Sequence, residues 1–546
     1  MIYLSAILIA MFLTIILVPI CRHLAFRLNI IDLPDERRVH TVPTPRMGGI
    51  AMALGALAPV LLWSRLSDFT ASVMIGAWIL VLFGMIDDRR GLDYRIKFAG
   101  QLAAAVFVVW FGGVKIVSLG MLLPDGYILP DFVAVPLTIL AIVGVTNAVN
   151  LADGLDGLAG GITLLIFMCL GYLAWKAQDT AVTVLAVSVA GAIIGFLRFN
   201  TYPAEVFMGD AGSQYLGFMA VTLSLSLTQT NIPLSPLVPL LLLGFPILDT
   251  MTVMMQRVSE GRSPFHPDKN HFHHKLMRLG LYHSEAVLVI YALQSLLVGS
   301  AVWLRFYSDW LLLTLYLCFS GLVLTGFHLA EKYGWKFREP DEANATTRLG
   351  LLSRLDRAGT TIRVVFKALE FTIPIIFIIM ALIPEDIPQY FAWFSLALAV
   401  TLLTVWLIGS QYTRSVLRLC LYMTIPFLVY EGQINPAHWI TQPINLTYGL
   451  LFLVLVGLVF VTLRLSRRAG FKSTPMDFLI LIVALVVPNL PDEPFQGQRM
   501  GMVAVKIIVL FFSYEVLIAE LRGQVKLQSL ATLGGLLLVS LRGLVL

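Results

Sequence analysis

Carboxylate and amide side chains gather where apolar segments of this chain end. The clearest case is the stretch NAVNLADGLDGLAGG at 147–161, which lies between two long apolar runs and carries Asp153 and Asp156. Ionisable groups beside hydrocarbon are costly and usually mark a site. Asn150, Asp153 and Asp156 are spaced three apart, so on a helix they would be neighbours. Such a set can ligate magnesium, hold an attacking group or hydrogen-bond a sugar, and a solvated loop with Asx turns is the alternative.

Two further acidic motifs also stand at the ends of apolar runs. In GMIDDRR, the adjacent carboxylates Asp87 and Asp88 repel each other, so keeping both ionised needs a cation or a positive environment; a hydrated loop neutralised by its arginines is the alternative. In VFMGDAGS, Asp210 lies between Gly209 and Gly212. Asp210 or Ser213 could be a helix N-cap; the other interpretation makes Asp210 a hard oxygen ligand for a divalent cation, with the glycines letting a phosphate approach the backbone.

A histidine-rich segment, RSPFHPDKNHFHHKLMR, contains Arg262, His271, His273 and His274. The spacing differs from the helical HExxH arrangement of zinc enzymes, and no cysteine accompanies it. With lysine and arginine alongside, the segment favours an anionic substrate pocket in which imidazoles hydrogen-bond a phosphate or sugar. A solvated basic loop is the alternative.

The segment ERRVHTVPTPRMGG carries His40 and Arg46, which could meet phosphates or anionic lipid. Together the motifs suit magnesium-dependent chemistry on a phosphate ester with a lipid partner. The sequence has neither a P-loop GxxxxGK[ST] nor a dinucleotide-binding glycine fingerprint after a strand, which argues against a soluble nucleotide-binding fold. The four cysteines are far apart and suggest no disulfide framework.

The elements that must position these residues are membrane helices. Of 546 residues, 58% are hydrophobic and 13% are charged, and the mean hydropathy is +0.85. A soluble domain carries about 25% charged residues, so the composition predicts an all-α polytopic membrane protein. The expected surroundings are the lipid membrane, and no nucleic-acid partner is expected. Apolar runs of spanning length predict eleven helices, near 2–20, 47–63, 70–86, 98–114, 133–149, 160–175, 181–198, 214–228, 235–255, 285–304 and 310–330.

The distribution of lysine and arginine predicts the orientation of these helices. The connections after odd-numbered spans are rich in basic residues, whereas those after even-numbered spans, such as SRLSD and AQD, are short and poor in them. Basic loops stay in the cytoplasm. All of the polar motifs therefore fall on the cytoplasmic face, and the first span, whose basic residues follow it, is expected to be retained with its N-terminus outside.

The sequence after residue 331 predicts a linker followed by a second membrane-spanning region. A polar stretch at 332–364 is expected to be a cytoplasmic linker, between a domain at 1–331 and an extension at 365–546. The extension contains about seven further apolar runs, of which the one at 477–488 is short, and it has few interior charges and no chemical motif. Its runs lie near 365–383, 390–409, 415–430, 447–463, 477–488, 502–519 and 527–545.

These motifs, in this order and in these loops, resemble the polyprenyl-phosphate N-acetylhexosamine-1-phosphate transferase superfamily. The resemblance covers roughly residues 1–330 and does not extend to the C-terminal part. Within the superfamily, HPDKNHFHH is similar to the undecaprenyl-phosphate GlcNAc-1-phosphate transferases, whereas phospho-MurNAc-pentapeptide transferases usually show a run ending HHHFE.

The resemblance implies a bundle of about eleven helices in the cell's inner (plasma) membrane, with its active site on the cytoplasmic face. A polyprenyl phosphate would attack the β-phosphate of UDP-GlcNAc and release UMP, as the first membrane step of a cell-envelope glycan such as lipopolysaccharide. Magnesium, which manganese could replace, would be held by Asp210 and Asp153. The remaining implied site residues are Asp87, Asp88 and Asp156 for catalysis and Asn150, Arg262, His271, His273, His274, Arg46 and His40 for substrate binding.

One implied role meets a physical objection. Asp87 would contact the attacking phosphate as its base, yet a phosphate monoester has a second pKa of about 6 and is largely ionised at neutral pH, so little proton remains to be removed. The alternatives are a different UDP-amino-sugar donor, the MurNAc-pentapeptide donor, or a transporter that uses the carboxylates as ion sites. Transporter sites tend to lie near the bilayer midplane, whereas these acids lie at span ends. The extension could regulate the protein, form a homodimer or serve another step.

Overall fold

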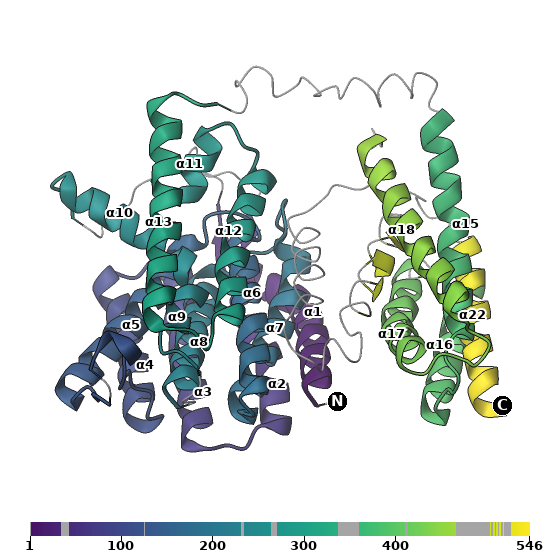
Figure 1. Ribbon diagram of the computed structural model, residues 1–546, viewed down its shortest axis with the longest axis horizontal. Coiled ribbons are helices and arrows are strands. Elements are labelled where there is room, and N and C mark those ends of the chain that lie inside the picture. The colour runs from purple at the N-terminus through teal and green to yellow at the C-terminus, as the bar shows by residue number, and fades with distance from the viewer. Residues whose placement is uncertain are drawn as a thin grey trace. The chain divides into compact units, whose positions relative to one another are not determined.

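The structure, a computed structural model, describes residues 2–33, 43–124, 126–230, 234–263, 270–336, 360–409, 413–465 and 526–545, with single residues between 503 and 517. The described residues up to 336 belong to one compact unit and those from 360 onward to another (Figure 1). Helices dominate both units. The strands among these residues are β1 (Ile31–Asp32) and β2 (Thr44–Pro45), which pair antiparallel.

The first unit is a helical bundle that agrees closely with the spans expected from the sequence. Its helices are α1 (Ile2–Leu28), α2 (Gly48–Trp63), α3 (Asp68–Arg90), α4 (Tyr94–Phe111), α5 (Asp131–Ala152), α6 (Leu158–Lys176), α7 (Thr180–Asn200), α8 (Gly209–Thr230), α9 (Val238–Leu242), α10 (Gly244–Ser259), α11 (Phe272–Arg278), α12 (His283–Trp303) and α13 (Asp309–Lys332). Within the described residues, eight helices of this unit and two of the other are long and apolar enough to cross a membrane. The prediction of an all-α, multi-pass membrane protein is confirmed.

Helix α8 lies at the centre of the first unit. It packs against α2, α3, α5 and α6, and almost every residue from Ala211 to Leu225 is buried. Small residues permit the close approach. A Cβ added at Gly84 of α3 would come within 2.4 Å of Ala211, and one at Gly217 within 2.8 Å of Thr146 of α5. Membrane helices, which gain little from the hydrophobic effect, associate through such small-residue contacts. The central helix therefore begins, at Gly209, where α3 and α5 end.

The ninth expected span, 235–255, is two short helices rather than one. Pro246 has no N–H to donate to the carbonyl of Leu242, so the helical hydrogen-bond ladder is interrupted between α9 and α10. The freed Leu242 carbonyl instead accepts a hydrogen bond of 2.7 Å from Gln294 Nε2 of α12. After the break, α10 changes direction and runs outward from the bundle (Figure 1).

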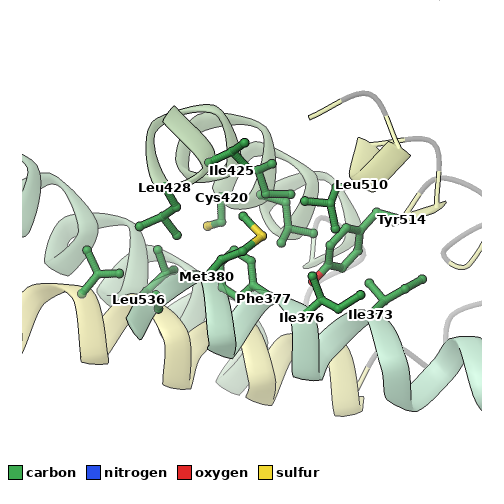
Figure 2. Close-up of a cluster of buried hydrophobic side chains, with 14 of the residues drawn as sticks. Ile373, Ile376, Phe377, Met380, Cys420, Ile425, Leu428, Leu510, Tyr514 and Leu536 are labelled. Atoms are coloured by element: carbon green, nitrogen blue, oxygen red, sulfur yellow. The ribbon is translucent and has the colours of Figure 1, made fainter. Parts of the chain in front are cut away.

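The second unit has an apolar core. Its helices are α15 (Thr360–Leu382), α16 (Gln389–Leu407), α17 (Thr413–Ile434), α18 (Gln442–Leu465) and α22 (Lys526–Val545). Figure 2 shows Phe377 and Met380 of α15 packed with Cys420 of α17 and Leu536 of α22. Helix α15 begins five residues before the expected 365. The expected run at 477–488 lies outside the described residues, and the run at 502–519 is described only in part.

Candidate active site

Two of the sequence-predicted acids meet at a lysine that the sequence analysis missed. Asp87 is at the end of α3, Lys97 at the start of α4 and Asp210 at the start of α8. The Lys97 ammonium donates to Asp210 Oδ2 at 2.7 Å and forms an ion pair with Asp87 Oδ2. The other Asp87 oxygen accepts the Leu92 N–H at 2.6 Å. Three helix ends thus place two carboxylates around one cation.

Asp88, the neighbour of Asp87, caps the central helix. Its two oxygens accept the backbone N–H groups of Asp210 at 3.0 Å and Ala211 at 3.3 Å. Gly209 has φ of +67°, and a Cβ there would lie 2.4 Å from Asp88 Oδ2, so the position requires glycine. The expectation that the glycines let a phosphate reach this backbone stays a prediction; in this structure Asp88 accepts the N–H groups of Asp210 and Ala211.

Arg46 reaches the acids from the β-hairpin. Its guanidinium donates to Asp32 Oδ1 at 2.6 Å and lies 3.9 Å from Asp88 Oδ1. The backbone around it is fixed, since Phe207 N–H donates to the Pro45 carbonyl at 2.8 Å. The Arg46 side chain is 30% exposed, so it borders the acids while remaining accessible to an anion. His40, predicted beside it in the same loop, lies outside the described residues.

The junction of α5 and α6 brings the 147–161 motif to the same place. Ser213 of α8 donates to Asn150 Oδ1 at 2.6 Å, and the Ala204 N–H donates to Asp156 Oδ2 at 2.9 Å. Asp153 is the C-cap of α5. Burial, together with the negative charges of Asp210 and Asp156, raises the pKa of Asp153 to about 7. Asp153 of the 147–161 motif therefore interacts electrostatically with Asp210, and its charged form is disfavoured unless a further cation is bound.

A network of side-chain amides connects the helices α4, α5 and α8, which carry the site residues. The Asn147 amide donates to Gln101 Oε1 at 2.6 Å, and the Gln101 amide donates to Gln214 Oε1 at 3.1 Å. These three residues belong to α5, α4 and α8. Because unpaired amides would be costly inside a membrane protein, the network fixes how the three helices pack.

The histidine segment is anchored by a second residue that the sequence analysis missed. Asp249 of α10 is buried, and its Oδ2 lies 3.0 Å from His271 Nδ1. Its Oδ1 accepts the N–H of Phe272 at 2.8 Å. A carboxylate paired with an imidazole nitrogen fixes the ring's orientation. An isolated aspartate inside an apolar run was the available sequence signal.

His273 links this segment to the acidic motifs. A Cβ added at Gly154 would lie 2.4 Å from His273 Nε2, so the ring rests directly on the loop between Asp153 and Asp156. The ring of His274 lies 4.2 Å from that of His273, centroid to centroid. Burial and the neighbouring imidazoles lower the pKa of His273 to about 3, so it acts as a neutral imidazole at physiological pH.

Arg262 has its ion pair with a residue outside this cluster. Its guanidinium pairs with Glu260 at the exposed end of α10, and both side chains are about 40% exposed. Its role in substrate binding stays a prediction.

The site residues fit a magnesium ion. Asp87, Asp88 and Asp210 share two cations, Lys97 and Arg46, and Arg46 also pairs with Asp32. The raised pKa of Asp153 means that its charged form is disfavoured there unless a further cation is bound. Among the described residues, no three His, Cys, Asp or Glu side chains form a ready-made metal cage. Magnesium usually takes one or two protein carboxylates and completes its shell with water and substrate phosphates. Asp210 and Asp153 can supply that limited set.

The fold and the site define a multi-pass membrane protein with an acidic centre at the ends of its central helices. The family model for glycosyl transferase family 4 matches residues 70–228, which include nearly all of α3 to α8 and the five acids Asp87, Asp88, Asp153, Asp156 and Asp210.

Named relatives agree with that match. A Bacillus subtilis protein named as a probable undecaprenyl-phosphate N-acetylglucosaminyl 1-phosphate transferase is 35% identical over 56% of this chain and 86% of its own length. A decaprenyl-phosphate N-acetylglucosaminephosphotransferase of Mycobacterium leprae is 38% identical over 49% of this chain and 75% of its own. An Escherichia coli K12 undecaprenyl-phosphate alpha-N-acetylglucosaminyl 1-phosphate transferase is 29% identical over 58% and 87%. The chain belongs to glycosyl transferase family 4 and is an enzyme.

Proposed function

We propose that the protein transfers N-acetylglucosamine-1-phosphate from UDP-GlcNAc to a polyprenyl phosphate and releases UMP, on the cytoplasmic face of the plasma membrane. The observation that carries this proposal is the convergence of Asp87, Asp210 and Lys97 with the Asp153 loop and the histidine segment. Three relatives named for polyprenyl-phosphate GlcNAc transfer support the donor and the acceptor. The basic loops beside the site support the cytoplasmic orientation.

In this reaction an oxygen of the lipid phosphate bonds to the β-phosphorus of the donor, and the bond from that phosphorus to the bridging oxygen breaks. The reactants are both anions, so they must be brought together against repulsion. Lys97 suits that task, because two carboxylates hold its ammonium while its side chain is 30% exposed. A remaining N–H can then donate to a phosphate oxygen. Asp87, engaged by Lys97 and by Leu92 N–H, positions this cation rather than serving as a base.

Asp210 and Asp153 are the residues that would hold magnesium. When bound there, the ion would supply positive charge against the reacting phosphates and the leaving UMP. Asp88 would keep Asp210 in place by capping α8. Arg46, at the rim of the same cluster, would contribute a guanidinium that matches phosphate geometry.

The histidine segment would bind the donor's sugar portion. Neutral His273 presents a hydrogen-bonding ring over Gly154, between the two acids of the loop. Asp249 fixes His271 beside it. Uncharged donors and acceptors of this kind suit hydroxyl and acetamido groups.

The test is UMP release by the purified full-length protein with undecaprenyl phosphate and magnesium. UDP-GlcNAc and UDP-MurNAc-pentapeptide are offered separately. Release with UDP-GlcNAc alone is expected. Release only with the pentapeptide donor would reassign the histidine segment, and the absence of release with either donor, from protein that remains folded, would contradict the proposal. Omission of magnesium with added chelator, followed by magnesium or manganese, tests the metal requirement.

A further inference from the structure

A second polar pocket lies in the first unit, between α10, α11 and α13. Its volume is about 380 Å³, and it is lined by Gln256, Asn270, Lys275, Arg278, Leu324, Phe327, His328 and Glu331. None of the five acids of the active site lines it, and neither do His271, His273 and His274. The proposed reaction therefore leaves this pocket without a role.

The lining of the pocket suits a phosphate ester. Lys275 and Arg278 are three residues apart on α11, so their charges lie on one side of the helix. Among the described residues, the carboxylate in the lining is Glu331, which lies 3.7 Å from Arg278 in a pair whose side chains are each more than half exposed. Exposed pairs of this kind are weak. An incoming phosphate can therefore replace Glu331 as the partner of Arg278. The Gln256 amide, one N–H of which donates to Glu260 at 3.0 Å, has a second N–H that can act as a further donor.

The position of the pocket suits a lipid. Leu324, Phe327 and Glu331 belong to the final turns of α13, a helix long and apolar enough to cross the membrane, so the pocket lies at a membrane edge. Helix α10 runs outward from the bundle beside it (Figure 1). Met251, Met255 and Val258 lie on one face of α10 and are 51%, 68% and 61% exposed. A helix lying in the membrane interface turns an apolar stripe of this kind toward the acyl chains.

We propose that this pocket binds the phosphate of an anionic membrane phospholipid, whose acyl chains follow the apolar stripe of α10. A soluble phosphate would use Lys275 and Arg278 but would gain nothing from exposed Met251 and Met255. A bound lipid could also affect the active site by fixing the position of α10. This helix carries both Gln256 of the pocket and Asp249, which pairs with His271.

The experiment measures lipid retained by the purified full-length protein, by native mass spectrometry after exposure to phosphatidylglycerol or phosphatidylcholine. Lys275→Gln with Arg278→Gln is the test variant. Arg22→Gln with Arg198→Gln is the matched control, because it removes the same charge from α1 and α7, helices that contribute no residue to the pocket lining. Retention of phosphatidylglycerol should fall about 25-fold in the test variant, if each cation contributes the roughly fivefold typical at an anionic surface, and stay near wild type in the control.

Glu331→Gln gives an independent test in the opposite direction. It removes the competing carboxylate, so retention of phosphatidylglycerol should rise severalfold. Equal retention by wild type, K275Q/R278Q and E331Q would overturn the proposal, as would equal retention of the two lipids. Loss of bound phosphatidylglycerol on adding millimolar inorganic phosphate or UDP-GlcNAc would also overturn it, because the pocket would then take a soluble phosphate. A thermal unfolding shift with phosphatidylglycerol that K275Q/R278Q lacks would support it.

Discussion

The two units are both bundles of apolar helices, yet their interiors differ in kind. In the first unit, buried aspartates and amides bond across helices, as Asp249 does to His271 and Gln101 to Gln214. In the described part of the second unit no aspartate or glutamate is buried, and the core is the apolar cluster of Figure 2. Several of its buried polar groups, including those of Gln528 and Thr532, have no hydrogen-bond partner. Buried polar groups without partners also occur in the first unit, and Arg542 of the second donates across helices to the Ala381 carbonyl. Buried aspartates bonded across helices therefore distinguish the unit that has the candidate active site.

The largest expected effect comes from Asp210→Asn. It removes a charge from the carboxylate that holds Lys97 and is the predicted magnesium ligand, so UMP release should fall at least about a thousandfold. Asp131→Asn, which changes an exposed carboxylate paired with Lys115, is the control and should stay within about twofold of wild type. Wild-type turnover of D210N at saturating magnesium would remove Asp210 from the site.

Lys97→Met should have the next largest effect, a fall of about a hundredfold in kcat. The variant leaves Asp87 and Asp210 facing each other without their shared cation. Lys97→Arg restores the charge with a different shape and should recover part of the loss. An unchanged kcat in K97M would show that the ion pairs at Lys97 serve only packing.

Asp249→Asn should reduce kcat/KM by roughly tenfold to a hundredfold, the range typical when a partner that orients a functional histidine is removed. The asparagine keeps the shape but lacks the charge that fixes His271. Combining D249N with His271→Ala tests the assignment. If Asp249 acts through His271, the double variant should be no worse than H271A alone, whereas additive losses would contradict it.

The smallest effect is expected from removing the second unit. A chain that ends at Asn344 retains all of the described site residues, so UMP release per folded molecule should change by less than about threefold. The measurement needs a folded fraction from size-exclusion chromatography. A well-folded but inactive truncated protein would show that the second unit is needed for the reaction. It would contradict the conclusion that the first unit alone contains the active site.

The fold was predictable because membrane helices follow apolar run length, and most helix positions agree with the expected spans. The exception, the span at 235–255, contains Pro246, whose missing N–H breaks the helix at a place where hydropathy alone shows continuity. Proline also occurs inside α1 and α5, so its presence alone did not signal a break.

The acids of the site were predictable and their partners were not. Asp87, Asp153 and Asp210 stand out because carboxylates at apolar run ends are rare. Lys97 did not stand out, because lysines are common in cytoplasmic loops and the orientation of the helices already accounts for one there. Asp88 looked like a twin of Asp87, and only the structure assigns one to Lys97 and the other to the backbone of α8.

The cap formed by Asp88 has a consequence for how substrates are held. A helix start carries a partial positive charge that phosphate-binding proteins commonly direct at their ligand. Here the N–H groups of Asp210 and Ala211 are directed at an internal carboxylate. The partial positive charge at the start of α8 therefore interacts with Asp88 and not with a substrate phosphate. The attraction that gathers two anionic reactants must then come from side-chain cations and an exchangeable metal, so substrate affinity should respond to salt concentration and metal supply more than a dipole-based cradle would.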